Sequence, residues 1–306
     1  MLVIVTYISN SFLLSILGCL MKSFLFWVLA LFITLSSAIY QRMTGPTHPT
    51  SGTVDFNNSE IDYYFYRTQG GTVDHLVSIE NKDTTITASL VWKRYKSRDD
   101  WTYIEMQSRN DSLIAYLPNQ PPAGKLEYYI KLSNDADEAN LPKDNTVVIR
   151  YKGSVPDTIL IIHIIFMFSS MLLSVRTGIE AFRKEPKLFK LTYWTLITLF
   201  IGGLIFGPIV QQYAFGALWT GFPFGHDLTD NKTLIIFIGW IVALFMYKKS
   251  AHPARWAIAT SILMMAIYLI PHSTLGSEID YEKLDSEKAK QELLDTTKKE
   301  VKDTLN

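Results

Sequence analysis

Long apolar runs fall once near the start of the chain and four more times after a polar stretch. They lie at about residues 22–40, 157–176, 190–210, 232–248 and 254–272. Crossing the hydrocarbon core of a bilayer takes about 20 predominantly apolar residues, so these runs are long enough or nearly so. The pattern predicts one N-terminal transmembrane helix, an inserted polar domain and a membrane α-helical bundle of about four helices over residues 156–272.

The inserted stretch, residues 41–155, changes to a period of two. Residues 126–132 alternate between apolar side chains and more polar ones, as a half-buried strand does. Similar short runs lie at 61–66, 75–79, 86–95, 101–106, 112–117 and 146–151. Asn, Asp, Gly and Pro clusters separate these runs, and the spacing predicts an all-β sandwich.

Four segments of this stretch carry a resemblance to a known fold. Residues 101–106, 113–118, 120–124 and 126–130 read WTYIEM, LIAYLP, QPPAG and LEYYI. Together they resemble the later strands of fibronectin type III-like domains in envelope and secreted proteins. The whole organisation resembles uncharacterised bacterial multi-pass envelope membrane proteins, and that resemblance implies a fold but no established activity.

Charge is distributed unevenly among the loops between the apolar runs. The loops after the second and fourth runs contain clustered Lys and Arg, whereas residues 211–231 contain neither. Basic loops of membrane proteins stay on the cytoplasmic side. We therefore predict a multi-pass protein of the cytoplasmic (inner) membrane, with the β-domain and the tail of residues 273–306 on the outer, periplasmic side.

The first residues fit this arrangement less well. Residues 1–21 lack a basic head, whereas Met21 and Lys22 open a conventional signal-anchor pattern. We interpret residues 1–21 as a doubtful leader or a mis-assigned start, and residues 22–40 as a signal-anchor transmembrane helix.

The composition narrows the classes of function. The 29 basic and 29 acidic side chains balance, which gives no indication of a nucleic-acid partner. Cys19 is the only cysteine, which excludes an internal disulfide and a cysteine-rich metal site. Since no hydrolase or kinase motif is present, a non-enzymatic role is favoured over an enzyme.

Three of the six histidines converge on the outer side of the predicted bundle. His163 lies about 8 Å below the outer end of its helix, His226 lies in the outer loop, and His272 closes the last run. Intramembrane polar groups are costly and often functional, and imidazoles from different helices can hold haem b or a metal ion. The alternative is that His226 and His272 are solvated and that His163 hydrogen-bonds a neighbouring helix.

Two further segments have specified local chemistry. In the loop of residues 219–232, Thr229 or Asp230 is predicted to cap the following helix, and cation binding by Asp227, Asp230 and His226 is the alternative. In the third apolar run, Gly203 and Gly207 predict close helix packing, and the adjacent proline predicts a kink or an end.

Two functional readings remain, and the first is favoured because no predicted span has the paired histidines at two depths that electron transfer across the membrane requires. Residues 277–306 contain nine acidic and six basic residues and predict a solvated helix, which can dock a partner. In the favoured reading the protein is a non-enzymatic integral envelope membrane protein whose β-sandwich and tail bind an envelope protein partner or act as a scaffold. In the alternative, the bundle holds haem or a metal ion at His163, His226 and His272 and serves electron transfer.

Overall fold

A computed structural model describes residues 2–57, 59–271, 276 and 278–304, with the side chains of residues 2–20, 293 and 296–304 left out. The chain forms two compact units. A helical unit comprises Met1–Pro46, Val155–Tyr213 and Ala217–Gly276, and a β-unit comprises Thr47–Ser154, Ala214–Gly216 and Ser277–Asn306. We describe each unit by itself.

The helical unit contains the apolar runs. Its elements are α1 (Leu2–Thr44), α2 (Asp157–Glu180), α3 (Leu188–Leu199), the π-helix η1 (Phe200–Phe206), α4 (Gly207–Phe215), α5 (Leu228–Lys249) and α6 (Pro253–Leu269). Among the described residues, four helices are long and apolar enough to cross a membrane: Met21–Thr44, Asp157–Glu180, Leu188–Phe215 and Leu228–Lys249. These spans indicate a multi-pass membrane protein, and α6 is a shorter apolar helix.

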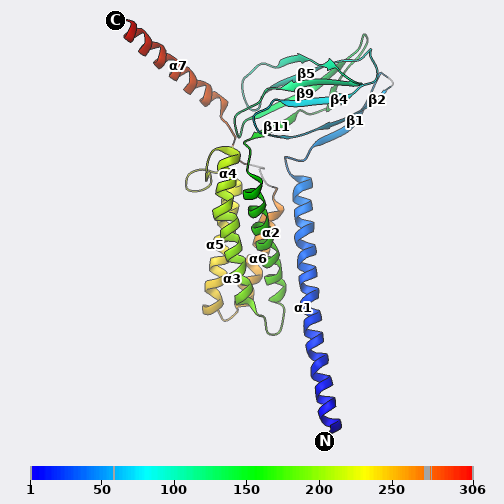
Figure 1. Ribbon diagram of the computed structural model, residues 1–306, viewed down its shortest axis with the longest axis vertical. Coiled ribbons are helices and arrows are strands. Elements are labelled where there is room, and N and C mark those ends of the chain that lie inside the picture. Colours follow the sequence, from blue (N-terminus) through cyan, green and yellow to red (C-terminus); the bar gives the residue numbers. More distant parts are fainter. Residues whose placement is uncertain (1, 58, 272–275, 277, 305–306) are drawn as a thin grey trace. The chain divides into compact units, whose positions relative to one another are not determined.

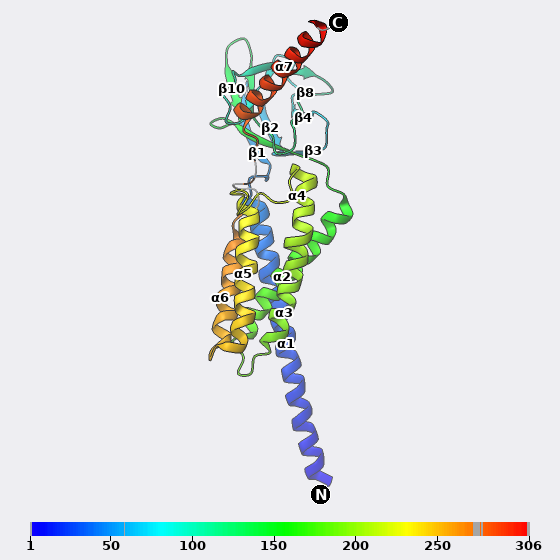
Figure 2. The same ribbon diagram turned by 90° about the vertical axis from the view of Figure 1, so that its left-hand side faces the viewer.

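The helices of this unit lie side by side (Figure 1, Figure 2). Their shared core is built from buried residues of several helices, including Ala30, Leu199, Trp240 and Met264. Trp240 donates its indole N–H to the Met264 sulfur at 3.2 Å, which joins α5 to α6. Helix α1 takes part in the same core through Ala30, and residues 2–20 continue it as one helix of 43 residues.

The third span changes its hydrogen bonding in the middle. At the end of η1 the Gly207 N–H bonds to the Gly202 carbonyl, five residues back. A Cβ at Gly202 would lie 2.9 Å from Phe166 Cβ, so this glycine allows close packing on α2. At Pro208 the sequence predicts a kink or an end of the helix. The helix instead widens into η1 before the proline and continues as α4 to Phe215. The wider turn accommodates the proline ring, which lacks an N–H.

The β-unit contains eleven described strands: β1 (Thr50–Phe56), β2 (Ser59–Phe65), β3 (Thr68–Gly70), β4 (His75–Glu80), β5 (Thr87–Arg94), β6 (Thr102–Glu105), β7 (Gln107–Ser108), β8 (Ser112–Leu117), β9 (Lys125–Ser133), β10 (Glu138–Leu141) and β11 (Val147–Lys152). They form a β1-β2 hairpin, a sheet in the order β3-β11-β9-β5-β6 with β10 added to β9, and a sheet in the order β4-β8-β7. All neighbours are antiparallel except β3 and β11.

All three sheets contribute to one hydrophobic core. In β9 the residues Leu126, Tyr128, Ile130 and Leu132 are fully buried, and the residues between them are half-buried. The period of two in the sequence therefore corresponds to the inward face of the central strand. All seven strand regions expected from the pattern are present, and β1, β3, β7 and β10 are additional.

The last helix, α7 (Tyr281–Thr304), confirms the helix expected in the tail. It belongs to the β-unit, not to the helical unit. Its residues 285–292 are exposed, whereas Tyr281 at its start is only 4% exposed. The start of α7 is therefore packed, and the following turns are solvated.

Candidate functional site

The packed start of α7 lies on a group of basic side chains that we call the basic strip: Arg94, Lys96, Arg98 and Lys125. Arg94 ends β5, and Lys125 begins β9. The two strands are antiparallel, and Arg94 is paired with Leu126. Strand pairing therefore places Arg94 and Lys125 at the same end of the sheet, and the loop after β5 adds Lys96 and Arg98.

Acidic side chains of the tail neutralise the basic strip. Glu278 binds two lysines, with Oε1 2.5 Å from Lys96 Nζ and Oε2 2.6 Å from Lys125 Nζ. Asp285 binds Arg94 through two parallel contacts of 2.9 and 2.6 Å. This fork-to-carboxylate geometry is the most specific form of an ion pair.

One more ion pair and an aromatic contact lie on the same side of α7. Glu282 Oε1 lies 2.9 Å from Arg98 Nε. The Arg94 guanidinium stands 4.8 Å from the centre of the Tyr281 ring. Tyr281, Glu282 and Asp285 lie in the first turns of α7, with Asp285 four and three residues after the other two, so the three share one face of the helix, and Glu278 precedes it.

Tyr281 is the central residue of the docked segment. Its hydroxyl accepts the Lys125 backbone N–H at 2.9 Å, and it lies 3.1 Å from the Lys125 carbonyl and 3.3 Å from Gln120 Oε1. A Cβ at Gly124 would lie 2.9 Å from this hydroxyl, so the glycine leaves the space that the tyrosine occupies. The tail thus joins the first peptide of β9 through a buried aromatic side chain.

The ion pairs between the tail and the basic strip favour the charged forms of Arg94 and Glu278. Hydrogen bonds to Asp99 and then to Asp285 raise the pKa of Arg94 above its ordinary value. Burial acts to raise the pKa of Glu278, but the hydrogen bonds from Lys125 and Lys96 outweigh it and bring the pKa below the usual 4.5. Asp99 forms a second ion pair with Arg94, with Oδ2 2.5 Å from Arg94 Nε.

The sequence predicted a helical tail but not its docking site. Two signals point to it in retrospect. Basic residues recur at 94, 96 and 98, and the charged tail contains a single aromatic residue, Tyr281. Neither signal identifies Lys125, because only strand pairing brings it beside Arg94.

The three candidate histidines have different surroundings. His163 Nδ1 lies 2.9 Å from the Gly202 carbonyl in η1, as expected for a histidine that hydrogen-bonds a neighbouring helix. His226 is exposed in the loop before α5, and His272 lies outside the described residues. In the part of the chain that the structure describes, no group of three or more His, Cys, Asp or Glu side chains is placed to hold a metal ion.

The loop before α5 is organised by two aspartates. Asp227, and not Thr229 or Asp230, caps the helix: its side chain accepts the N–H groups of Thr229 and Asp230. Helix α5 begins at Leu228, two or three residues earlier than a cap at Thr229 or Asp230 would require. Asp230 is buried, and its Oδ2 accepts the N–H groups of Thr220 at 2.6 Å and Gly221 at 3.0 Å. These bonds involve one oxygen of each carboxylate that the sequence offers as a cation ligand.

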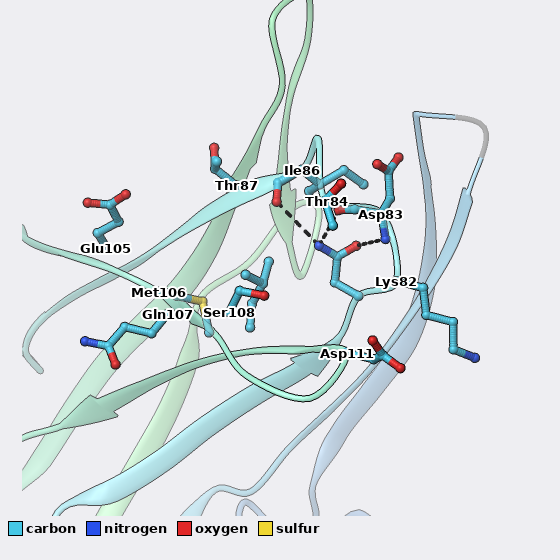
Figure 3. A pocket seen from close by; sticks show the side chains of 12 residues that line it. Lys82, Asp83, Thr84, Ile86, Thr87, Glu105, Met106, Gln107, Ser108 and Asp111 are labelled. Atoms are coloured by element: carbon cyan, nitrogen blue, oxygen red, sulfur yellow. Dashed lines mark hydrogen bonds between the residues drawn. The ribbon is translucent and has the colours of Figure 1, made fainter.

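A cavity of about 680 Å³ opens in the β-unit beside the loop between β4 and β5 (Figure 3). Three of the residues that line it bond to one another. Asn81 Nδ2 donates to the carbonyls of Asp83 at 2.8 Å and Ile86 at 3.4 Å, and the Asp83 N–H returns to Asn81 Oδ1 at 3.1 Å. Such side-chain bonds to nearby backbone form a turn, so Asn81 and Asp83 have a structural role here.

Similarity to other proteins does not assign any of these sites. No model of a known protein family matches the chain, and no curated protein matches it. The docked tail is therefore the arrangement from which a function is inferred.

Proposed function

We propose that this chain is a non-enzymatic integral membrane protein of a bacterial envelope, and that its β-unit and tail bind a protein partner. The β-unit and tail lie on the outer, periplasmic side of the cytoplasmic membrane, and the first span serves as a signal anchor. The β-unit is a fibronectin type III-like sandwich. In this role the helical unit anchors the protein and the tail carries the contact surface.

The docked tail is the observation that carries this proposal. The basic strip fixes residues 278–285 through four carboxylate contacts and one buried tyrosine. Helix α7 has 24 residues, so it is about 36 Å long. A solvated helix that is fixed at one end is a presented surface for a partner, because its direction is already set and less conformational entropy is lost on binding.

The charge pattern supports the orientation. The loop between α2 and α3 contains Arg183, Lys184 and Lys187, whereas the loop between α4 and α5 contains neither Lys nor Arg. Under the positive-inside rule the first loop is cytoplasmic. Because successive spans cross the membrane in alternate directions, residues 47–154 then lie outside.

Site-specific photo-crosslinking in intact cells tests the partner role. A photoreactive residue at exposed Lys288 or Lys290 of the full chain is expected to give a discrete protein adduct. The adduct should weaken when Tyr281→Ala releases the tail and should persist with Tyr116→Phe, a change on an exposed tyrosine of β8. Crosslinks to lipid alone, or a protein adduct that is indifferent to Tyr281→Ala, would contradict the proposal.

The haem or metal alternative rests on His163. A ligating histidine typically donates its second ring N–H to a carbonyl, and the Gly202 carbonyl is in that position. The visible absorption spectrum and metal content of the detergent-purified protein test this alternative. A Soret band that disappears in His163→Ala would support it, and a colourless, metal-free preparation would refute it.

A further inference from the structure

Two loops of the helical unit lie at the same end of its helices (Figure 1, Figure 2). One loop joins α2 to α3 over residues 181–187, and the other joins α5 to α6 over residues 250–252. A small buried core joins the helix ends around both loops. Its residues are Ala181, Leu188 and Ala257, with Tyr247 and Ala254 packed against them. The ends of four helices therefore hold the two loops next to each other.

An aromatic contact supports the same arrangement. The Phe189 ring of α3 lies 5.4 Å from the Tyr247 ring of α5. Phe189 follows the first loop, and Tyr247 precedes the second. The helix turns that adjoin the two loops therefore share one rim of the bundle.

Six cationic side chains belong to this rim, and all six are exposed. They are Lys184, Lys187, Lys190, Lys248, Lys249 and Arg255, which we call the cationic rim. The ion pairs between described residues include none of the six. Within residues 181–190 and 247–256, all of which the structure describes, Glu185 is the only acidic residue. The rim therefore has a strong excess of positive charge.

A second carboxylate near the rim does not offset this excess. Glu180, the last residue of α2, is only 2% exposed. Its oxygens lie 2.7 Å from Arg176 Nη1 and 3.3 Å from Arg183 Nη1. The charge of Glu180 is thus compensated by two other arginines. The exposed cations of the rim are left to interact with an anion outside the chain.

Exposed aromatic side chains adjoin these cations. Phe182 is 79% exposed, Phe245 is 56% exposed and Trp256 is 38% exposed. Lys249 Nζ lies 4.5 Å from the centre of the Phe245 ring. Aromatic side chains are enriched where hydrocarbon meets the lipid headgroups, and long Lys side chains extend their charge to that level. A ligand with both a phosphate and apolar chains matches both kinds of side chain.

The rim coincides with the ends of the candidate membrane spans. Two spans end at Glu180 and Lys249, and another begins at Leu188. The boundary of a span lies at the level of the headgroups. Orientation in the membrane accounts for positive charge in each loop, but it does not require that the two loops pack together. Their common core therefore suggests a shared ligand.

We propose that the cationic rim binds the headgroup of an anionic phospholipid through cations of both loops, with the acyl chains against the exposed aromatic side chains. A soluble phosphate ester has the same charge but no apolar chains, so Phe182 and Phe245 favour the lipid. The proposal requires only that the helices span a bilayer. It is therefore independent of the side on which the β-unit lies and of the docked tail.

Native mass spectrometry of the full-length, delipidated protein in detergent tests the proposal. The probes are phosphatidylglycerol and phosphatidylcholine with identical acyl chains, and soluble glycerol 1-phosphate. We expect saturable binding of phosphatidylglycerol, at least about tenfold tighter than binding of phosphatidylcholine. A basic residue near an anionic lipid contributes about fivefold, so Lys248→Gln with Lys249→Gln should weaken this binding about 25-fold. Lys184→Gln with Lys187→Gln should have a similar effect.

The matched control is Lys288→Gln with Lys290→Gln, which removes two exposed charges from α7 and should leave lipid binding unchanged. Because all the replaced side chains are exposed, each variant should keep the melting temperature of the parent protein in detergent. Equal affinity for the two lipids would overturn recognition of the headgroup. An equal loss in the control, or a loss in only one of the two loop variants, would overturn the shared site. Displacement of the lipid by glycerol 1-phosphate at equal concentration would overturn the lipid as the ligand.

Discussion

Replacing Tyr281 by Phe should release the tail without disturbing the β-unit. Phe keeps the ring under Arg94 and removes only the hydroxyl. That hydroxyl accepts the Lys125 N–H at 2.9 Å, and Tyr281 is 4% exposed, so water does not replace it while the ring stays in place. The docked state of Tyr281→Phe therefore keeps a buried N–H without its partner.

The loss of docking in Tyr281→Phe can be calculated from the Lys125 N–H that is left without an acceptor. A buried polar group that loses its partner costs about 1–3 kcal/mol. Undocking removes this penalty because the Lys125 N–H then meets water. The ratio of docked to undocked tail should therefore fall by roughly 5- to 150-fold. Tyr281→Ala should fall further, since it also removes a buried aromatic ring.

Hydrogen exchange of the Lys125 amide in the full-length protein measures this ratio. The amide should exchange faster in Tyr281→Phe by the same factor, because it is released when the tail undocks. The Tyr95 amide, which donates to the Lys125 carbonyl at 3.0 Å within the sheet, is the internal control and should keep its rate. Equal Lys125 rates in the two proteins would refute the reasoning, and so would an equal acceleration in Tyr116→Phe.

Three other changes test the structure at separate places. Docking of the tail should weaken as the pH falls below about 4.5, because the pKa of Glu278 is lowered in the docked state. Protonation of Glu278 removes its ion pairs with Lys96 and Lys125. Glu278→Gln should make docking less dependent on pH in the same hydrogen-exchange assay. Gly202→Ala should lower the melting temperature in detergent, since its Cβ would lie 3.0 Å from the Met167 backbone nitrogen. Gly207→Ala meets nothing closer than 3.5 Å and should be tolerated; equal losses would contradict the packing argument. Burial lowers the pKa of His75 below 6.5, so thermal stability should fall as the pH drops from 7 toward 5, and an unchanged melting curve would contradict its burial as a neutral ring.

Elements governed by local periodicity were predictable from the sequence. Apolar runs identified the spans, since a bilayer requires a fixed length of apolar helix. The alternation at residues 126–132 identified the inward face of β9, and six other strands followed in the same way. The short strands β3 and β7 were missed because two or three residues contain no period.

Features that depend on distant residues were not predictable. Lys125 and Tyr281 are 156 positions apart, and their contact arises only from strand pairing and the folded tail. Tyr128 reads as an ordinary core position, and its unsatisfied hydroxyl becomes visible only when its neighbours are known. The convergence of His163, His226 and His272 stays a prediction, with the hydrogen bond from His163 to Gly202 as the contact described so far.

The central claim is that the β-unit and the tail lie outside the cytoplasmic membrane, and cysteine labelling tests it most directly. Single cysteines are treated with a membrane-impermeant thiol reagent in intact cells whose outer membrane has been permeabilised. Cys19→Ser removes the native thiol, and cysteines then replace exposed Glu105 of β6, Lys290 of α7 or Lys184 between α2 and α3. An envelope protein that displays its β-unit and tail outside predicts labelling at positions 105 and 290, with labelling at 184 only after the cytoplasmic membrane is broken. Labelling at 184 in intact cells, or protection at 105 and 290, would contradict the account.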